Sequence, residues 1–231
     1  MIGGRVWQWG IGVARQIWGA RIVGLLIVDT LFLILHVGRV RYSQPSSDLW
    51  LISYDRGYAE IFQYLKLATV IVLLVQLALA RRVAVYVGWS VLFLYFLLDD
   101  SVEIHETAGE WLSNAIGLAS VGSVSARDIG QVLVSGIALV ILGGAIYLMW
   151  PPSGSREERF SIGLGVLVAL LGFFGVVVDV IDAIDLFNVV EDGGEMAAMS
   201  LIVAYVWSSV WEVRGGPEVL VGSGRSEKDH G

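Results

Sequence analysis

The chain has 231 residues, of which 56% are hydrophobic and only 16% are charged, and its mean hydropathy is +0.72. These values exclude a soluble globular domain and predict an all-α polytopic protein of the cell (inner) membrane, with the lipid bilayer as its first partner. A net charge of -7 excludes a continuous basic surface, so we expect no nucleic acid partner. The absence of cysteine excludes disulfides and thiolate metal sites, so a metal site must be built from carboxylates and imidazoles.

The first 21 residues alternate aromatic and aliphatic side chains with Arg5, Arg15 and Arg21. This pattern predicts an N-terminal helix that lies in the membrane interface. No small-residue cleavage site follows the first apolar core before Arg39, so we expect this segment to be retained rather than removed as a signal peptide.

Six apolar segments follow, and they predict one transmembrane bundle over residues 22–213. The predicted spans are 22–38, 61–80, 84–98, 129–150, 161–181 and 191–211. The fourth span has almost no ionisable group, so we place it at the periphery of the bundle. Residues 214–231 are rich in Gly and Ser with mixed charges, which predicts a disordered cytoplasmic tail.

The flanks of the spans differ in positive charge, and this sets the predicted orientation. One side carries Arg5, Arg15, Arg21, Arg81, Arg82, Arg156, Arg159, Arg214, Arg225 and Lys228. The other side carries only Arg39, Arg41, Arg56, Lys66 and Arg127. Because the more positive side stays in the cytoplasm, both termini are predicted to be cytoplasmic and every acidic cluster to lie outside.

The acidic run 99–110 continues the third apolar segment without a break. If the helix continues, Asp99, Glu103, Glu106 and Glu110 form one stripe, because they are spaced four, three and four residues apart. Ionised carboxylates this close repel one another unless a cation neutralises them. The alternative is a helix that leaves the membrane with a solvated polar face.

Further acidic residues lie at the ends of the fifth and sixth spans. Gly165, Ala169 and Gly172 predict a closely packed face that leads to Asp179. The whole predicted set of metal ligands is Asp99, Glu103, Glu106, Glu110, Asp179, Asp182, Glu191 and Glu195. The alternative roles are turn residues in the outer hairpin and carboxylates that complement the positive end of the sixth helix.

Carboxylates with one or two imidazoles suit a divalent cation such as Mg, Ca, Mn or Fe. The sequence has no Glu-x-x-His pair, so a di-iron oxidase is not predicted. Asp29 and His36 share one face of the first span and, with His105, form a possible relay. His36 and His105 as the two ligands of a haem is a less favoured alternative. Neither lysine, Lys66 nor Lys228, falls in the middle of an apolar segment, which excludes a Schiff-base lysine.

Two function classes follow from these patterns, and the sequence leaves the oligomeric state open. The first is a metal-dependent enzyme that acts on a lipid or other hydrophobic small molecule, with Glu106 as the general base. The second is a cation- or proton-coupled transporter with Asp29 as a relay. The scarcity of polar residues in the inner halves of the spans favours the first slightly. An accessory membrane subunit is a third alternative.

Overall fold

The computed structural model describes residues 19–120, 122, 124–178 and 186–213. Six helices in this part are long and apolar enough to cross a membrane, so the predicted all-α, six-span fold is confirmed. Asp179 and Asp182, almost all of the predicted interfacial helix and the predicted tail 214–231 lie outside the described residues.

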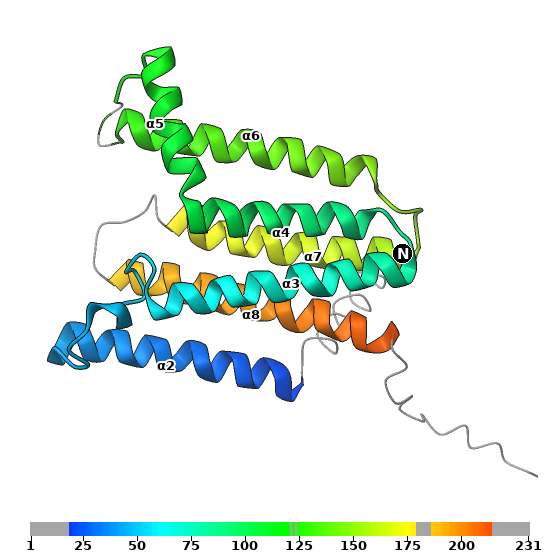
Figure 1. Ribbon diagram of the computed structural model, residues 1–231, viewed down its shortest axis with the longest axis horizontal. Helices are drawn as coiled ribbons and strands as arrows, with labels where there is room; N and C mark the ends of the chain where they lie inside the picture. Colours follow the sequence, from blue (N-terminus) through cyan, green and yellow to red (C-terminus); the bar gives the residue numbers. More distant parts are fainter. Residues whose placement is uncertain (1–18, 121, 123, 179–185, 214–231) are drawn as a thin grey trace, which may run out of the picture.

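The six spans run side by side, and a seventh helix, α5, crosses one end of the bundle (Figure 1). The spans are α2 (Ala20–Tyr42), α3 (Tyr58–Arg81), α4 (Val85–Val102), α6 (Ala126–Leu148), α7 (Arg156–Gly172) and α8 (Leu186–Val213). A π-helical segment, η2 (Phe173–Val178), continues α7, and a short 3-10 helix, η1 (Asp48–Trp50), lies between α2 and α3. The helix α5 comprises Ile104–Ile116. We call the two ends of the bundle the α5 end and the opposite end.

The helix α8 is the centre of the bundle and packs against α2, α3, α7 and η2. Its Tyr205 is 2% exposed, and the Tyr205 ring stacks on Phe160 of α7 with the ring centroids 5.3 Å apart. A Cβ atom at Gly163 would lie 2.3 Å from the Tyr205 hydroxyl, so a glycine is needed there.

The prediction of which residues form the closely packed face of the fifth span is wrong. Ala169 and Gly172 are exposed, and a Cβ at Gly172 would meet nothing within 4 Å. The buried face of α7 instead comprises Phe160, Ser161, Gly163, Leu164 and Leu167. The reason is that large apolar side chains fill this interface, while one glycine admits the Tyr205 ring.

The expected position of the fourth span agrees with the structure. The helix α6 buries only Gly130 and Ile146 among its described residues and packs against α4 and α5. Its outward face, which includes Val132, Val140 and Ile141, is therefore available to lipid.

The acidic run does not form one continuous helix, so the predicted stripe is broken. Glu103 has a left-handed backbone conformation (φ 57°), which ends α4 and begins α5. The Asp99 carboxylate accepts a hydrogen bond from the backbone N–H of His105 at 2.9 Å. This contact satisfies one of the amides left unpaired at the start of α5, which explains why the chain turns here.

Candidate functional site

An ion pair is buried between three spans. The Lys66 ammonium of α3 donates to the Asp29 carboxylate of α2, with Nζ and Oδ1 2.6 Å apart. It also donates to the carbonyl oxygen of Met196 in α8 at 3.0 Å and lies 4.7 Å from the centre of the Phe62 ring. Ser200 of α8 donates to the second Asp29 oxygen at 2.5 Å. Asp29 and Lys66 are 3% and 2% exposed, so their partners are protein groups rather than water.

Both charges lie well inside the spans. Lys66 is eight residues from the start of α3, or roughly 12 Å at about 1.5 Å per residue. Asp29 is nine residues from the start of α2 and thirteen from its end. The hydrocarbon layer of a bilayer is about 30 Å thick, so both groups lie at hydrocarbon depth when the helices span it. The sequence placed Lys66 near one end of the second span, and α3 begins at Tyr58 rather than at the predicted residue 61, so Lys66 lies about one turn deeper than expected.

Apolar side chains close the ion pair off in both directions. Toward the α5 end lies a small cluster of Ile52, Ala59 and Met196 with Phe32 and Leu33 packed against it. We call these five residues the apolar lid. Toward the opposite end lies the main hydrophobic core of the bundle. The ion pair is therefore occluded in this structure.

The helix α2 is attached to the bundle by a narrow and partly polar face. Its buried side chains among the described residues are Ile22, Asp29 and His36, which recur every seven residues. His36 accepts a hydrogen bond through Nδ1 from the backbone N–H of Ile52 at 3.1 Å, which holds the loop after α2 against the helix. Two of the three buried contacts of α2 are thus polar.

The predicted relay of Asp29, His36 and His105 is not continuous here. Asp29 and His36 are seven residues, or roughly 10 Å, apart along α2. His105 belongs to α5, on the other side of the bundle from α2 (Figure 1). His36 and His105 therefore do not face one another, which also rules out their pairing across one haem.

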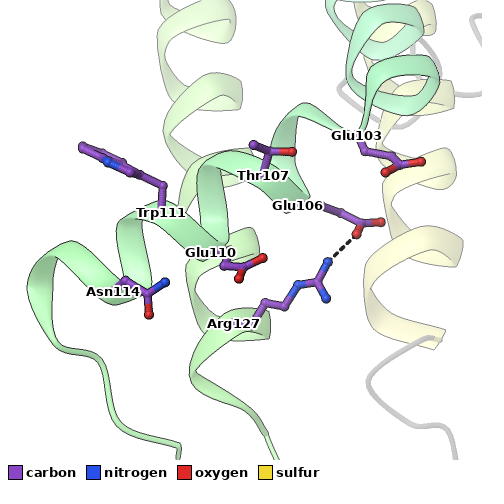
Figure 2. A pocket seen from close by; sticks show the side chains of 7 residues that line it. All are labelled: Glu103, Glu106, Thr107, Glu110, Trp111, Asn114 and Arg127. Carbon is purple, nitrogen blue, oxygen red and sulfur yellow. Dashed lines mark hydrogen bonds and ion pairs between the residues drawn. The ribbon is translucent and has the colours of Figure 1, made fainter.

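A pocket of about 330 Å³ opens at the α5 end (Figure 2). It is lined by Glu103, Glu106, Thr107, Glu110, Trp111 and Asn114 around α5 and by Arg127 of α6. The Arg127 guanidinium donates to the Glu106 carboxylate at 2.6 Å. Glu103 is paired with Arg56 at 3.2 Å. In the part of the chain that the structure describes, no cation is paired with Glu110.

Close backbone packing fixes the shape of this pocket. A Cβ at Gly130 of α6 would lie 2.2 Å from the carbonyl oxygen of Gly109 in α5, and a Cβ at Gly109 would lie 2.6 Å from the amide nitrogen of Gln131. Both glycines are required for this approach. The contact places Arg127, one turn before Gly130, beside Glu106.

Asp99 and His105 form a separate pair at the corner between α4 and α5. The His105 Nδ1 atom lies 3.1 Å from the Asp99 carboxylate. This hydrogen bond raises the pKa of His105 above its ordinary value of 6.5, and partial burial of the ring opposes it. The pair links the end of α4 to the start of α5.

The acidic residues at the start of α8 pack against other helices than the acidic residues of α5 do. The first turns of α8 contact α2, α3 and η2, and the Glu195 carboxylate lies against Gly175 of η2. The structure does not bring Glu191 and Glu195 together with Glu103 and Glu106. Over residues 19–120, 124–178 and 186–213, no three Asp, Glu or His side chains are placed to hold a metal ion.

One carboxylate oxygen of α8 has no hydrogen-bond partner among the described residues. This atom, Oδ2 of Asp192, is inaccessible to solvent. The predicted set of metal ligands contained the neighbouring Glu191 and Glu195 but not this residue, because helical spacing alone does not show which carboxylate points inward.

The cationic partners are what reasoning from the sequence missed. Lys66, Arg56 and Arg127 each neutralise a carboxylate that was predicted to need a metal or to act as a relay. Lys66 is 37 positions from Asp29, and Arg56 is 47 positions from Glu103, so spacing along one helix could not reveal either pair.

Six apolar spans with a charge pair buried between them define an α-helical multi-pass membrane protein. Within this class, the chain belongs to the family described as a domain of unknown function (DUF8692), which matches residues 20–209. No curated protein and no solved structure matches the chain.

Proposed function

We propose that this protein is a proton- or cation-coupled membrane carrier with Asp29 and Lys66 as its coupling site. The observation that carries the proposal is the ion pair, 2.6 Å long and buried between α2, α3 and α8. Charged side chains at hydrocarbon depth are costly and face the protein interior, where they commonly belong to ion pathways or proton relays.

Stability alone does not explain such a pair. Replacing a buried ion pair by apolar side chains of similar volume is often neutral or stabilising, because both charges must be desolvated. A proton on Asp29 has a larger consequence. It removes the charge of the carboxylate and leaves the Lys66 ammonium buried without a counterion, which costs several kcal/mol. Protonation therefore favours a state in which Lys66 reaches water.

The helix α2 is the element best placed to respond. Its face toward the bundle is narrow, and Val23, Ile27 and Leu31 are exposed to lipid, so moving it breaks few apolar contacts. Separation of α2 from α8 would part Leu33 from Gly193, which it covers, and open the apolar lid. A path would then connect Asp29 with the α5 end of the bundle.

Acid-loaded vesicles that contain the purified protein test this function. A pH-sensitive dye reports the gradient while Na⁺, K⁺ or a divalent cation is added outside. At least one ion is expected to dissipate the gradient with the wild type. Asp29→Asn should abolish this response, and Asp55→Asn, which removes an exposed carboxylate at the α5 end, should retain it.

Two results would contradict the carrier function. If no ion dissipates the gradient, or if Asp29→Asn transports as well as the wild type, the buried pair is a structural lock. The accessory-subunit alternative then replaces the carrier.

A divalent-cation site is a second candidate function, and Asp192 is the observation that favours it. Its buried Oδ2 has no protein hydrogen-bond partner among the described residues, and Glu195 lies one turn away on α8. A bound Mg, Ca, Mn or Fe(II) ion would raise the free energy of unfolding by about 2.7 kcal/mol at a hundredfold excess over its dissociation constant. Asp192→Asn should lose that response. No ion-specific rise in the wild type would exclude the site.

A metal-dependent enzyme has weaker support. That hypothesis needs Glu106 as a free general base, whereas its carboxylate is held by Arg127 at 2.6 Å. A base must be within reach of the proton that it removes and available to accept it.

A further inference from the structure

The helix α5 runs across the direction of the six spans and reaches beyond α6 on the side away from α4 (Figure 1). A helix in this position lies along the membrane surface when the spans cross the bilayer. Its overhanging part then covers lipid rather than protein. The pocket between α5 and α6 is therefore at the depth of the lipid headgroups.

The pocket has both signs of charge, with carboxylates in excess. Three carboxylates and one guanidinium line it. The charged groups of Glu106, Glu110 and Arg127 are directed toward the same space, whereas the ring of Trp111, which also lines the pocket, points to the other side in this view (Figure 2). This arrangement disfavours a purely anionic ligand and suits a molecule that has an ammonium group beside a phosphate.

Each half of such a ligand has a partner. A primary ammonium has N–H donors for carboxylates such as Glu110, which has no ion pair among the described residues. The Arg127 guanidinium has five N–H donors, and one nitrogen is used by Glu106, so others remain for phosphate oxygens. A choline headgroup fits less well, because its quaternary ammonium has no N–H and Trp111 does not face the carboxylates.

The surface next to the pocket suits acyl chains. After Arg127, the helix α6 exposes Val132, Leu133 and Ile137. Ile137 is ten residues from Arg127, or roughly 15 Å. This is about half of the ~30 Å hydrocarbon layer, so the apolar strip is as long as the chains of one leaflet.

We propose that the pocket between α5 and α6 binds the headgroup of an ethanolamine-type zwitterionic phospholipid from the leaflet at the α5 end. The ammonium lies between Glu106 and Glu110, the phosphate lies on Arg127, and the chains follow α6. The proposal is independent of the carrier function, since it involves neither Asp29 nor Lys66.

Native mass spectrometry of the protein with added lipid tests the site. Phosphatidylethanolamine and phosphatidylcholine with identical chains are compared. The wild type is expected to retain the ethanolamine lipid about tenfold more strongly, the factor that one hydrogen bond to a charged group provides. Glu110→Gln should reduce retention of the ethanolamine lipid to that of the choline lipid, whereas Arg127→Gln should weaken retention of both lipids, because both have the phosphate. Asp55→Asn, outside the pocket, should retain it like the wild type.

Three results would overturn the proposal. The first is equal retention of both lipids by the wild type. The second is unchanged preference in Glu110→Gln, whose fold is checked by its melting temperature. The third is binding of glycerophosphoethanolamine, which has no acyl chains, as tightly as phosphatidylethanolamine. The ligand would then be a soluble molecule rather than a lipid.

Discussion

Lys66 and Asp29 lie 2.6 Å apart, although they come from different spans and are 37 positions apart in the sequence. With side chains 2% and 5% exposed, this is the most deeply buried ion pair among the described residues. Removing one partner of a buried ion pair is costly, because the other charge is left buried without a counterion.

The first prediction concerns the stability of this pair. Lys66→Met should lower the free energy of unfolding by about 3 to 5 kcal/mol, because it leaves the Asp29 carboxylate buried without its cation. Asp29→Asn combined with Lys66→Met should recover most of the loss, because both charges are then absent and the introduced amide oxygen still accepts from Ser200. Thermal unfolding in detergent measures both variants. A double variant as unstable as the single one would mean that the pair is needed for folding itself.

The second prediction concerns the crossing of α5 and α6. Gly130→Ala should destabilise the protein by about 1 to 3 kcal/mol, because the new Cβ would lie 2.2 Å from the Gly109 carbonyl oxygen. Gly136→Ala on the same helix is the matched control, since a Cβ there meets nothing within 4 Å. It should be neutral or slightly stabilising. Equal melting temperatures for the two variants would contradict the close contact.

The third prediction is a pH dependence at the corner between α4 and α5. Asp99 raises the pKa of His105 above 6.5, so protonated His105 stabilises the folded state. Because the folded pKa is above the unfolded one, this stabilisation is complete below about pH 6.5 and is lost as the pH rises through the folded value. The melting temperature of the wild type should therefore exceed that of His105→Gln most in acid. A gap that widens toward alkaline pH would contradict this.

The fourth prediction concerns topology. The chain has no cysteine, so single cysteines can be introduced without background. Cysteines that replace Ser46 and Ser120, both at the α5 end, should react with an impermeant thiol reagent outside intact cells. A cysteine that replaces Ser155, at the opposite end, should be protected. The reverse pattern would invert the orientation that the arginine and lysine counts predict.

The class of fold could be predicted from the sequence because it depends on local properties. Apolar runs of sufficient length identified every span, including the peripheral fourth one. The helix boundaries were less accurate, and α3 begins at Tyr58 rather than near residue 61. This difference of about one turn moved Lys66 from a predicted membrane boundary into the bundle.

The candidate site could be predicted only in part, because its partners meet through tertiary packing. The position of Asp29 in the first span indicated an inward-facing charge, and the structure agrees. Helical spacing could not predict the break at Glu103, which separates Asp99 from Glu106. The stripe argument also assumed that carboxylates lack nearby cations, whereas Arg56 and Arg127 supply two of them.

The central claim is that a proton on Asp29 opens the apolar lid, and one introduced cysteine tests it most directly. Ala59 is 3% exposed in the lid, so Ala59→Cys changes little and should be protected from thiol reagents at neutral pH. Ser90→Cys, buried in α4 away from the pair, is the control for general loosening.

The measurement is the labelling rate of the Ala59→Cys thiol against pH, with and without Asp29→Asn. The account predicts faster labelling as the pH falls, fast labelling at every pH when Asp29 is replaced, and no change for the Ser90→Cys control. Labelling of Ala59→Cys that is slow at every pH in both backgrounds would contradict it.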